Sequence, residues 1–392
     1  MEMAIDRKKF RIPLFCLVTL MFWFSMYTYV PILAYYVEYL GATHMTAGII
    51  VGSYGFTQML LRIPVGIMSD RLHKRRLFIT FGLFFSLLSG LGLVVTGNLT
   101  VILIFRSLAG AAAATWVDFT ILFSSYFKHE EATKSIGIIS FFSSIGQMFG
   151  MLFGGFVANS YGFKAPFIFG VIIGSAGLIL SLFLVDKYDE NAQKITFKGV
   201  VEVIKDHTLL VVSFLAILSQ LVTFATVFGF TPLYAATLGA SKLQMSILTV
   251  FSTLATAIAS IYGGGILSKK FGEKKVAVFG FVITGIFTVT IAFTTSLPML
   301  IFTQTIAGFG RGLAFTVLMG LSIRHMPTDK RATAMGFFQS IYGLGMFAGP
   351  FIMGAISDKV SQRQGFIFTG IVACITSFLA LIMLKRPKEN LL

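Results

Sequence analysis

The chain consists mainly of long apolar segments separated by short polar ones. An α-helix needs about 20 apolar residues to cross the hydrocarbon core of a bilayer. Twelve segments meet this length, at residues 12–33, 45–67, 77–96, 100–126, 134–157, 165–185, 209–231, 244–267, 276–295, 298–323, 334–356 and 366–384. The pattern predicts an all-α integral membrane protein with twelve transmembrane helices, and it leaves no room for a soluble catalytic domain.

The composition supports a membrane protein. Of the 392 residues, 56% are hydrophobic and only 12% are charged, whereas soluble domains carry about 25% charged residues. The charged start, Arg7 to Arg11, runs directly into the first apolar segment. This arrangement predicts an uncleaved first helix rather than a removable signal peptide.

The net charge of +15 is explained by topology. If the N-terminus is cytoplasmic, 24 of the 31 Lys and Arg residues fall in cytoplasmic segments, 4 in outer loops and 3 within spans. The positive-inside rule then predicts a multi-pass protein of the cytoplasmic (inner) membrane with both termini in the cytoplasm. No nucleic-acid partner is expected. Both cysteines lie within spans, so we expect no disulfide framework, no metal site and no cofactor.

The longest polar stretch divides the twelve spans into six and six. We predict an N-terminal bundle at 1–185, a cytoplasmic linker at 186–208 and a C-terminal bundle at 209–392. Within the linker, Thr196 to Asp206 alternates apolar and charged residues. This pattern fits either an amphipathic helix on the membrane surface or a solvated connection.

The two halves of the sequence repeat one another. A shift of 199 residues places GIMSDRLHKRR (66–76) on GILSKKFGEKK (265–275) and aligns five glycines, at 66, 137, 146, 150 and 155, with glycines at 265, 336, 345, 349 and 354. The repeat predicts two parallel six-helix bundles. A binding site is expected where such halves meet near the middle of the bilayer.

The loop Gly66 to Arg76 resembles the G-x-L-A-D-R-x-G-R-K signature of the major facilitator superfamily, except that His73 stands where that family usually has glycine. Arg106 to Gly110 is similar to its R-x-x-x-G element, and Gly146 to Gly155 to the G-x-x-x-G-P-x-x-G-G element of drug:proton antiporters, with Met151 replacing the proline. The resemblance covers the whole chain. It implies the family's twelve-helix fold, secondary active transport by alternating access, and similarity to its bacterial drug and metabolite efflux branch.

Several residues are candidates for gating. Asp70, in the signature with Gly66 and Arg71, is expected to accept hydrogen bonds from a helix N-terminus of the other half and to act as a two-state latch. The alternative is a charge cluster that only sets topology, and we assign Lys74, Arg75 and Arg76 to that role. The small residues of spans 5 and 11 are expected to allow close helix packing; they are Gly146, Gly150, Gly349 and Pro350.

Ionisable residues within spans are the candidates for proton coupling. Asp118 is the one acid within a span, and Glu38, at an outer edge, is a second choice. Arg62 lies at a depth comparable to that of Asp118, so we expect an ion pair that serves either structure or coupling. Arg106 shares span 4 with Asp118 but lies 12 residues away, about 18 Å along a helix, so these two cannot pair directly.

Arg311, near the centre of span 10, is the main candidate for substrate binding. No acid of the second half shares its depth, so its guanidinium is expected to meet an anionic group of a substrate. The alternative is a hydrogen bond to backbone carbonyls or to Gln304. Five further side chains at similar depth either stack on and hydrogen-bond a ligand or only pack between helices; they are Trp23, Tyr27, Gln147, Gln220 and Tyr342.

These observations predict a secondary active transporter for a small organic solute. We expect a monomer in the bilayer, coupled to protons, with an anionic or zwitterionic substrate and with export as its direction. The alternatives are a multidrug:proton antiporter for amphipathic compounds and an uptake symporter for a small organic anion. A channel is disfavoured because no filter or ring of charge is present. An enzyme is disfavoured because no metal cluster or nucleophile–base group is present, and ATP-driven transport because no P-loop is present.

Overall fold

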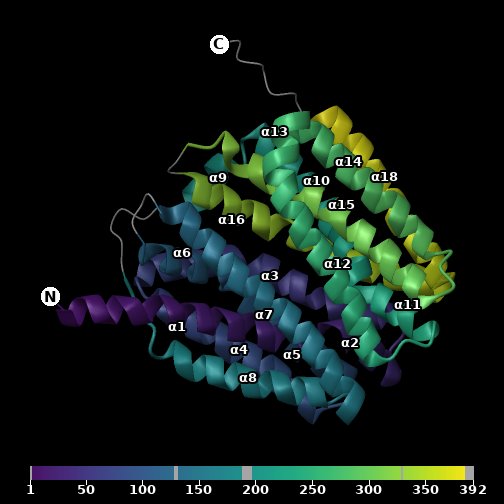
Figure 1. Ribbon diagram of the computed structural model, residues 1–392, viewed down its shortest axis with the longest axis horizontal. Helices are drawn as coiled ribbons and strands as arrows, with labels where there is room; N and C mark the ends of the chain where they lie inside the picture. Colours follow the sequence, from purple (N-terminus) through teal and green to yellow (C-terminus); the bar gives the residue numbers. More distant parts are fainter. Residues whose placement is uncertain (1, 128–130, 188–196, 328–329, 385–392) are drawn as a thin grey trace. The chain divides into compact units, whose positions relative to one another are not determined.

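The protein is described by a computed structural model that covers residues 2–127, 131–187, 197–327 and 330–384 (Figure 1). These residues form helices and connecting turns, without a strand. Ten helical stretches are long and apolar enough to cross a membrane. Together with α3 (His44–Leu72) and the shorter α8 (Ala165–Ser181), they match the twelve predicted spans one to one. The predicted all-α, twelve-helix class is confirmed.

The first six spans contain eight helices, because two of the spans are interrupted. In chain order they are α1 (Glu2–Tyr27), α2 (Val30–Tyr39), α3, α4 (Arg75–Val95), α5 (Leu99–Ala114), α6 (Trp116–Ser125), α7 (Ala132–Tyr161) and α8. Pro31 lies at the start of α2, where its missing N–H costs nothing because that donor would be unpaired in any case.

The second six spans include two π-helical turns. The helices are α10 (His207–Ala225), η2 (Thr226–Phe230), α11 (Thr231–Thr237), α12 (Lys242–Tyr262), η3 (Gly263–Leu267), α13 (Ser268–Phe271), α14 (Glu273–Ile291), α15 (Leu297–Arg324), α16 (Arg331–Ile341), α17 (Gly343–Lys359) and α18 (Gln362–Met383). Before them lies α9 (Phe197–Val203), within the predicted linker. Linker residues 188–196 lie outside the described residues.

The chain forms two compact units. Unit 1 comprises Met1–Ala42, Ser53–Phe197 and Ala240–Ile247, and unit 2 comprises Thr43–Gly52, Lys198–Gly239 and Leu248–Leu392. Helix α3 therefore begins in unit 2 and ends in unit 1, whereas α12 begins in unit 1 and ends in unit 2. The division into 1–185, 186–208 and 209–392 stays a prediction, from which these units differ by the exchange of two helix ends.

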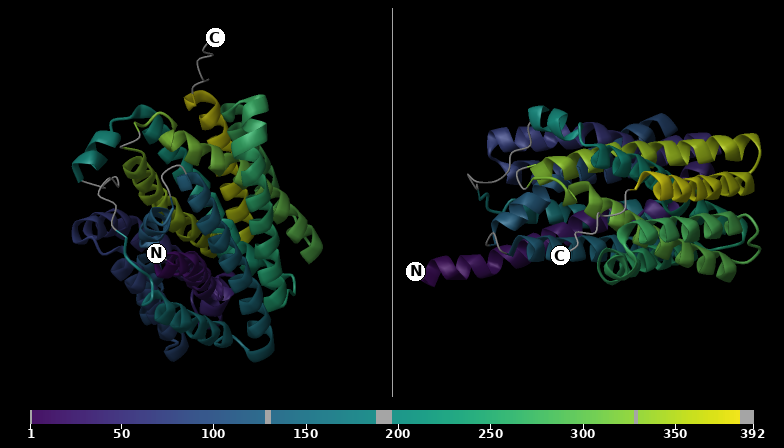
Figure 2. Two further views of the ribbon diagram at one scale, coloured as in Figure 1. Left: turned by 60° about the vertical axis from the view of Figure 1, so that its left-hand side comes forward. Right: turned by 90° about the horizontal axis from the view of Figure 1, so that it is seen from above.

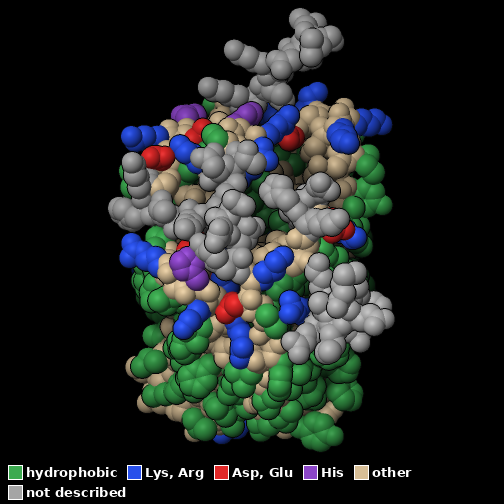
Figure 3. Space-filling view, turned by 90° about the vertical axis from the view of Figure 1, so that its left-hand side faces the viewer, with side chains coloured by type: hydrophobic (Ala, Val, Ile, Leu, Met, Phe, Trp, Pro, Cys, Tyr) green, Lys and Arg blue, Asp and Glu red, His purple; other side chains and the backbone are tan. Residues whose placement is uncertain are grey.

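Large hydrophobic side chains remain exposed on many helices. Examples are Ile172, Phe302 and Ile382, which are 58%, 61% and 63% exposed. Figure 3 shows hydrophobic side chains covering the lower part of the surface in that view. Exposed apolar surface of this extent is expected where lipid, rather than water, surrounds the helices.

Within each unit, a helix rich in glycine packs closely on a neighbour. A Cβ atom added to Gly146 or Gly150 of α7 would lie 2.5 Å from a backbone oxygen of α1. In unit 2, a Cβ added to Gly345 or Gly349 of α17 would lie 1.9 or 2.2 Å from a backbone oxygen of α10. The α1–α7 and α10–α17 pairs run side by side (Figures 1 and 2). The repeat of glycines thus corresponds to a repeat of helix contacts.

Gly349→Ala tests this packing. The added methyl group would overlap the carbonyl of Leu221, so α17 must move away from α10, at a cost of about 1–3 kcal/mol. We expect a lower thermal unfolding temperature in detergent for this variant. Gly320→Ala is the matched control, because Gly320 of α15 is exposed and its Cβ would meet nothing within 4 Å. Equal stability of the two variants would contradict the prediction.

Candidate functional site

Unit 1 holds a buried cluster of one arginine and two acids. Asp118, in the first turn of α6, is fully buried and accepts a hydrogen bond at 3.2 Å from Nη1 of Arg75, the first residue of α4. The same guanidinium pairs with Asp70, near the end of α3. The ion-pair partner of Asp118 is therefore Arg75. The prediction from depth, that Arg62 pairs with Asp118, is wrong. The assignment of Arg75 to topology alone is also wrong.

The turn between α3 and α4 brings Arg75 back toward Asp70. His73, in this turn, has φ of 55°, in the left-handed region that L-residues other than glycine seldom adopt. Gly272 at the corresponding turn of unit 2 has φ of 85°. This conformation explains why glycine suits the position in the signature loop. It also explains why helical spacing alone does not predict the Asp70–Arg75 pair.

The two arginines within the spans of unit 1, Arg62 and Arg106, have no acid among their described partners. Arg62 is 4% exposed and donates from Nη2 to the carbonyl of Ala113 at 3.1 Å. Arg106 is 3% exposed and donates to the hydroxyl of Tyr29 at 3.2 Å. Its guanidinium carbon also lies 4.9 Å from the ring centre of Tyr54, within the range of a cation–π interaction.

The aromatic candidates of unit 1 lie near one another. The Trp23 ring is 5.8 Å from Tyr27 and 5.2 Å from Trp116, and both candidates are buried. The indole Nε1 of Trp23 is buried without a hydrogen-bond partner among the described residues. Trp116 is a member of this cluster that the depth argument misses, although its position two residues before Asp118 is visible in the sequence.

Two further candidates lie apart from this cluster. Gln147, on α7, donates to Ser143 one turn earlier at 3.2 Å, so its described bond is a local one within its own helix. Glu38 is half-buried near the end of α2. Neither residue has a described contact with the Asp118 cluster.

Unit 2 contains Arg311 on α15. It is 4% exposed, and its Nη2 donates to the hydroxyl of Ser252 on α12. Its Nη1 is buried without a hydrogen-bond partner among the described residues. Gln304 instead donates to Thr231, at 3.2 Å. The guanidinium therefore has a hydroxyl partner, in place of the carbonyl or Gln304 that we considered, and one donor group left over.

The remaining candidates occupy varied positions. Tyr342, in the break between α16 and α17, packs its ring 5.6 Å from both Phe315 and Phe338. Gln220 is half-buried on α10. Of the gating candidates not yet placed, Gly66 is buried, Arg71 is exposed and Pro350 is buried within α17.

The polar side chains thus form two separate centres. Unit 1 combines two carboxylates with the Arg75 guanidinium, and unit 2 presents the Arg311 guanidinium with a single neutral partner. Across the part of the chain that the structure describes, no group of three metal-ligating side chains occurs. This arrangement of charges within a helical bundle suits a solute carrier, in which intramembrane charges pair with each other or with cargo.

The model of the Major Facilitator Superfamily matches residues 15–236 and again 212–391. The chain belongs to the major facilitator superfamily. Together the two matches cover residues 15–391. Membership makes the protein a membrane transporter rather than an enzyme, with a small-molecule substrate and the lipid bilayer as its partners.

Similar proteins of the superfamily cover nearly the whole chain. An uncharacterized MFS-type transporter of Methanocaldococcus jannaschii is 26% identical over 368 residues, covering 91% of this chain and 93% of its own. Multidrug resistance protein 2 of Bacillus subtilis is 24% identical over 392 residues, covering 92% and 91%. A bacterial homolog to the human lysosomal transporter Spinster, in an inward-facing and unoccupied conformation, shares the fold with a TM-score of 0.78, 16% identity and 96% coverage of both chains.

The Asp118–Arg75 pair can be tested by a double-mutant cycle. Asp118→Asn removes one of the two carboxylates that pair with Arg75, and Arg75→Gln leaves both carboxylates without their cation, so each should destabilise the protein. The double variant should lose less than the sum, with a coupling of about 0.5–3 kcal/mol. The measurement is chemical unfolding in detergent micelles.

Arg62→Gln is the control for this cycle, because Arg62 donates to the carbonyl of Ala113. Its effect should add to that of Asp118→Asn within about 0.5 kcal/mol. If Arg62 couples to Asp118 more strongly than Arg75 does, the assignment of the pair is wrong.

Proposed function

We propose that this superfamily member exports a small organic solute with an anionic group, in exchange for protons, across the cytoplasmic membrane. Both termini lie in the cytoplasm, and the monomer is the working unit. The observation that carries the proposal is Arg311, a buried guanidinium whose Nη1 has no described hydrogen-bond partner.

The free energy of a buried charge supports this role for Arg311. A charge removed from water is costly unless it is paired, and Ser252 supplies only one neutral acceptor. A carboxylate or phosphate of a substrate would satisfy the free donor and neutralise the charge, and a planar guanidinium favours such groups. Substrate binding would therefore remove the free-energy penalty of the buried, incompletely paired charge of Arg311. Tyr342, Gln220 and Gln147 are proposed to complete the contacts with the substrate.

A second candidate function is multidrug:proton antiport. It is favoured by the aromatic cluster of Trp23, Tyr27 and Trp116, which offers flat apolar surface to amphipathic compounds. The name of the similar Bacillus subtilis protein, Multidrug resistance protein 2, supports a multidrug substrate class. The third possibility, uptake of a small organic anion by symport, differs in the direction of net flux.

Asp118 is the proposed proton carrier. Its Oδ1 accepts from Arg75, and the Ser69 side chain is a further hydrogen-bonding neighbour of this buried carboxylate. Protonation of this carboxyl would weaken its hold on Arg75 and leave that guanidinium to Asp70. Because Asp70 is the proposed latch on the cytoplasmic side, a proton on Asp118 would change the strength of the latch. Arg62, Arg106 and Glu38 are proposed to set the local charge around this step.

The proposed transport cycle alternates access to the two sides of the membrane. Asp70 would hold the cytoplasmic side closed, with Gly66 and Arg71 shaping its loop. The close helix contacts at Gly146, Gly150, Gly349 and Pro350 would let α7 and α17 shift against their neighbours without opening gaps.

Substitutions of Arg311 test the substrate class. Arg311→Lys keeps the charge but loses the planar group, and Arg311→Gln loses both. With a ligand found by screening anionic metabolites for an increase in melting temperature, we expect affinity to fall about tenfold for Lys and about a hundredfold for Gln. Gln304→Ala is a control that leaves the guanidinium in place. Equal affinity in the wild type and both arginine variants would make Arg311 purely structural.

Substitution of Asp118 tests proton coupling. In proteoliposomes, Asp118→Asn should abolish accumulation driven by a pH gradient and retain exchange of solute at equilibrium, because only the proton step is lost. The Arg62→Gln variant and the unsubstituted protein are measured beside it. Full pH-driven accumulation by Asp118→Asn would remove this residue from the mechanism, and the direction of net flux would decide between export and uptake.

A further inference from the structure

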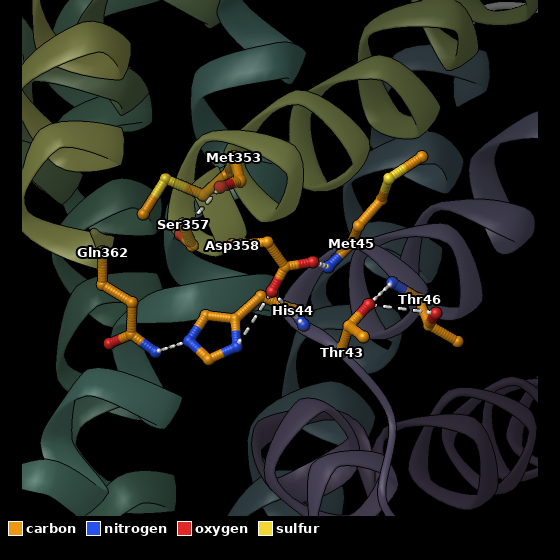
Figure 4. A network of polar contacts seen from close by, with 8 residues as sticks. All are labelled: Thr43, His44, Met45, Thr46, Met353, Ser357, Asp358 and Gln362. Atoms are coloured by element: carbon orange, nitrogen blue, oxygen red, sulfur yellow. Dashed lines mark hydrogen bonds and ion pairs between the residues drawn. The ribbon is translucent and has the colours of Figure 1, made fainter. Parts of the chain in front are cut away.

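The N-terminus of α3 is capped by a side chain from a distant part of the sequence. The carboxylate of Asp358, at the end of α17, accepts hydrogen bonds from the backbone N–H groups of His44 and Met45, both at 2.9 Å (Figure 4). Asp358 is separated from these residues by more than 300 positions. All three residues belong to unit 2.

This cap completes the hydrogen bonding of the first turn of α3. The first four N–H groups of a helix have no partner within it. Thr43 satisfies two of them, because its hydroxyl accepts from the N–H of Thr46 at 3.2 Å and its carbonyl from that of Ala47 at 2.9 Å. The other two depend on Asp358. A carboxylate also interacts favourably with the positive end of the helix dipole.

Side chains extend the contact between α3, α17 and α18. Nδ1 of His44 lies 3.6 Å from Oδ1 of Asp358, and Nε2 of His44 lies 2.9 Å from Nε2 of Gln362, the first residue of α18 (Figure 4). The side chains of His44 and Asp358 are 31% and 30% exposed. The contact is therefore accessible to water, which can replace it when the helices separate.

Small residues hold α3 close enough to α17 for this cap. A Cβ added to Gly354 would lie 2.3 Å from the carbonyl oxygen of His44, and one added to Gly48 would lie 2.1 Å from that of Pro350. The backbones therefore touch over the first turn of α3. Asp358 lies one turn beyond Gly354, at the end of this contact.

The corresponding helix end in unit 1 is built differently. Ser241 and Gln244 form a reciprocal cap of α12: the N–H of Ser241 donates to the Gln244 side chain at 2.9 Å, and the N–H of Gln244 to the Ser241 hydroxyl at 3.3 Å. This capping box belongs to α12 itself. Helix α12 also docks on glycine, since a Cβ on Gly155 of α7 would lie 2.3 Å from the Ser246 hydroxyl.

The two helices differ in whether the cap depends on docking. Helix α12 carries its own cap wherever it moves, whereas α3 is fully capped only while it is docked on α17. Docking of α3 thus gains two charge-assisted hydrogen bonds, and none is described for the docking of α12; such bonds are roughly twice as strong as neutral ones.

We propose that Asp358 is a positioning residue for transport, a latch that holds the N-terminal end of α3 on α17 and releases it once in each cycle. The proposal rests on the proposed function for its sidedness, because the predicted topology places both residues on the outer side. There the latch would close the outer side, opposite to the proposed Asp70 latch. A solute can reach the site from outside only after the two N–H groups exchange Asp358 for water.

A distance measurement tests the latch without any substrate. Spin labels at Met45→Cys and Val360→Cys, with Cys16 and Cys374 replaced by serine, report the separation of α3 and α17 in lipid nanodiscs by pulsed electron resonance. Val360 is 68% and Met45 is 38% exposed, so labels are tolerated. Asp358→Asn should lower the ratio of the short-distance to the long-distance population about tenfold, as loss of one charge-assisted bond predicts. Asp358→Ser, which is shorter, should lower it at least as much.

Three variants separate the cap from its surroundings. His44→Ala keeps the backbone N–H groups and should change the ratio by less than about threefold. Lys359→Gln, which alters the neighbouring exposed charge, and Gln244→Ala, which removes the local cap of α12, should leave it unchanged. An unaltered ratio in both Asp358 variants, or an equal shift in Lys359→Gln, overturns the proposal. Because no ligand is used, this result is independent of the roles proposed for Arg311 and Asp118.

Discussion

The close approach of helix backbones at glycine determines much of this structure. In a bilayer, lipid tails are as apolar as leucine, so helices associate through tight packing and polar contacts rather than through burial from water. Gly146 and Gly150 bring α7 against α1, and Gly345 and Gly349 bring α17 against α10. These contacts recur in both halves and fix the positions from which the polar side chains reach one another.

Each buried guanidinium has a different set of described partners. Arg75 bridges two carboxylates, Arg62 donates to a backbone carbonyl, and Arg106 lies against two tyrosine rings. Arg311 has a single hydroxyl. The differences follow from what each unit can offer, since a buried charge requires compensation from its surroundings. The guanidinium with the least compensation is the one for which a charged ligand would change the energy most.

Much of the fold follows from the sequence because its signals are local or repeated. Apolar segments of membrane-spanning length predict all twelve spans, and the glycine spacing predicts close packing at spans 5 and 11. The structure extends several spans beyond the apolar residues, as in α3 and α7, because helices continue into the polar flanks. Hydropathy also misses the interruptions at η2 and at Thr115, since neither changes the apolar pattern.

The contacts of the site are harder to predict from the sequence. They depend on the direction in which each side chain points around its helix and on the turns that connect the helices. Depth along a helix suggests Arg62 as the partner of Asp118, but depth does not say which way a side chain points. The left-handed backbone conformation of His73 turns the chain between α3 and α4. Arg75, which the sequence suggests is an exposed loop residue, therefore joins the buried cluster. The Asp358 cap joins residues 314 positions apart, and no spacing rule connects them.

The exchange of helix ends between the two units has a consequence for folding. Helix α3 has 29 residues, about 43 Å at 1.5 Å per residue, and its two ends lie in different compact units. Neither half of the sequence therefore contains a whole unit, and unfolding of either unit removes part of the other. Loss of structure should thus be a single cooperative event, and synthesis of the first six spans alone leaves a partly assembled intermediate until the second six arrive.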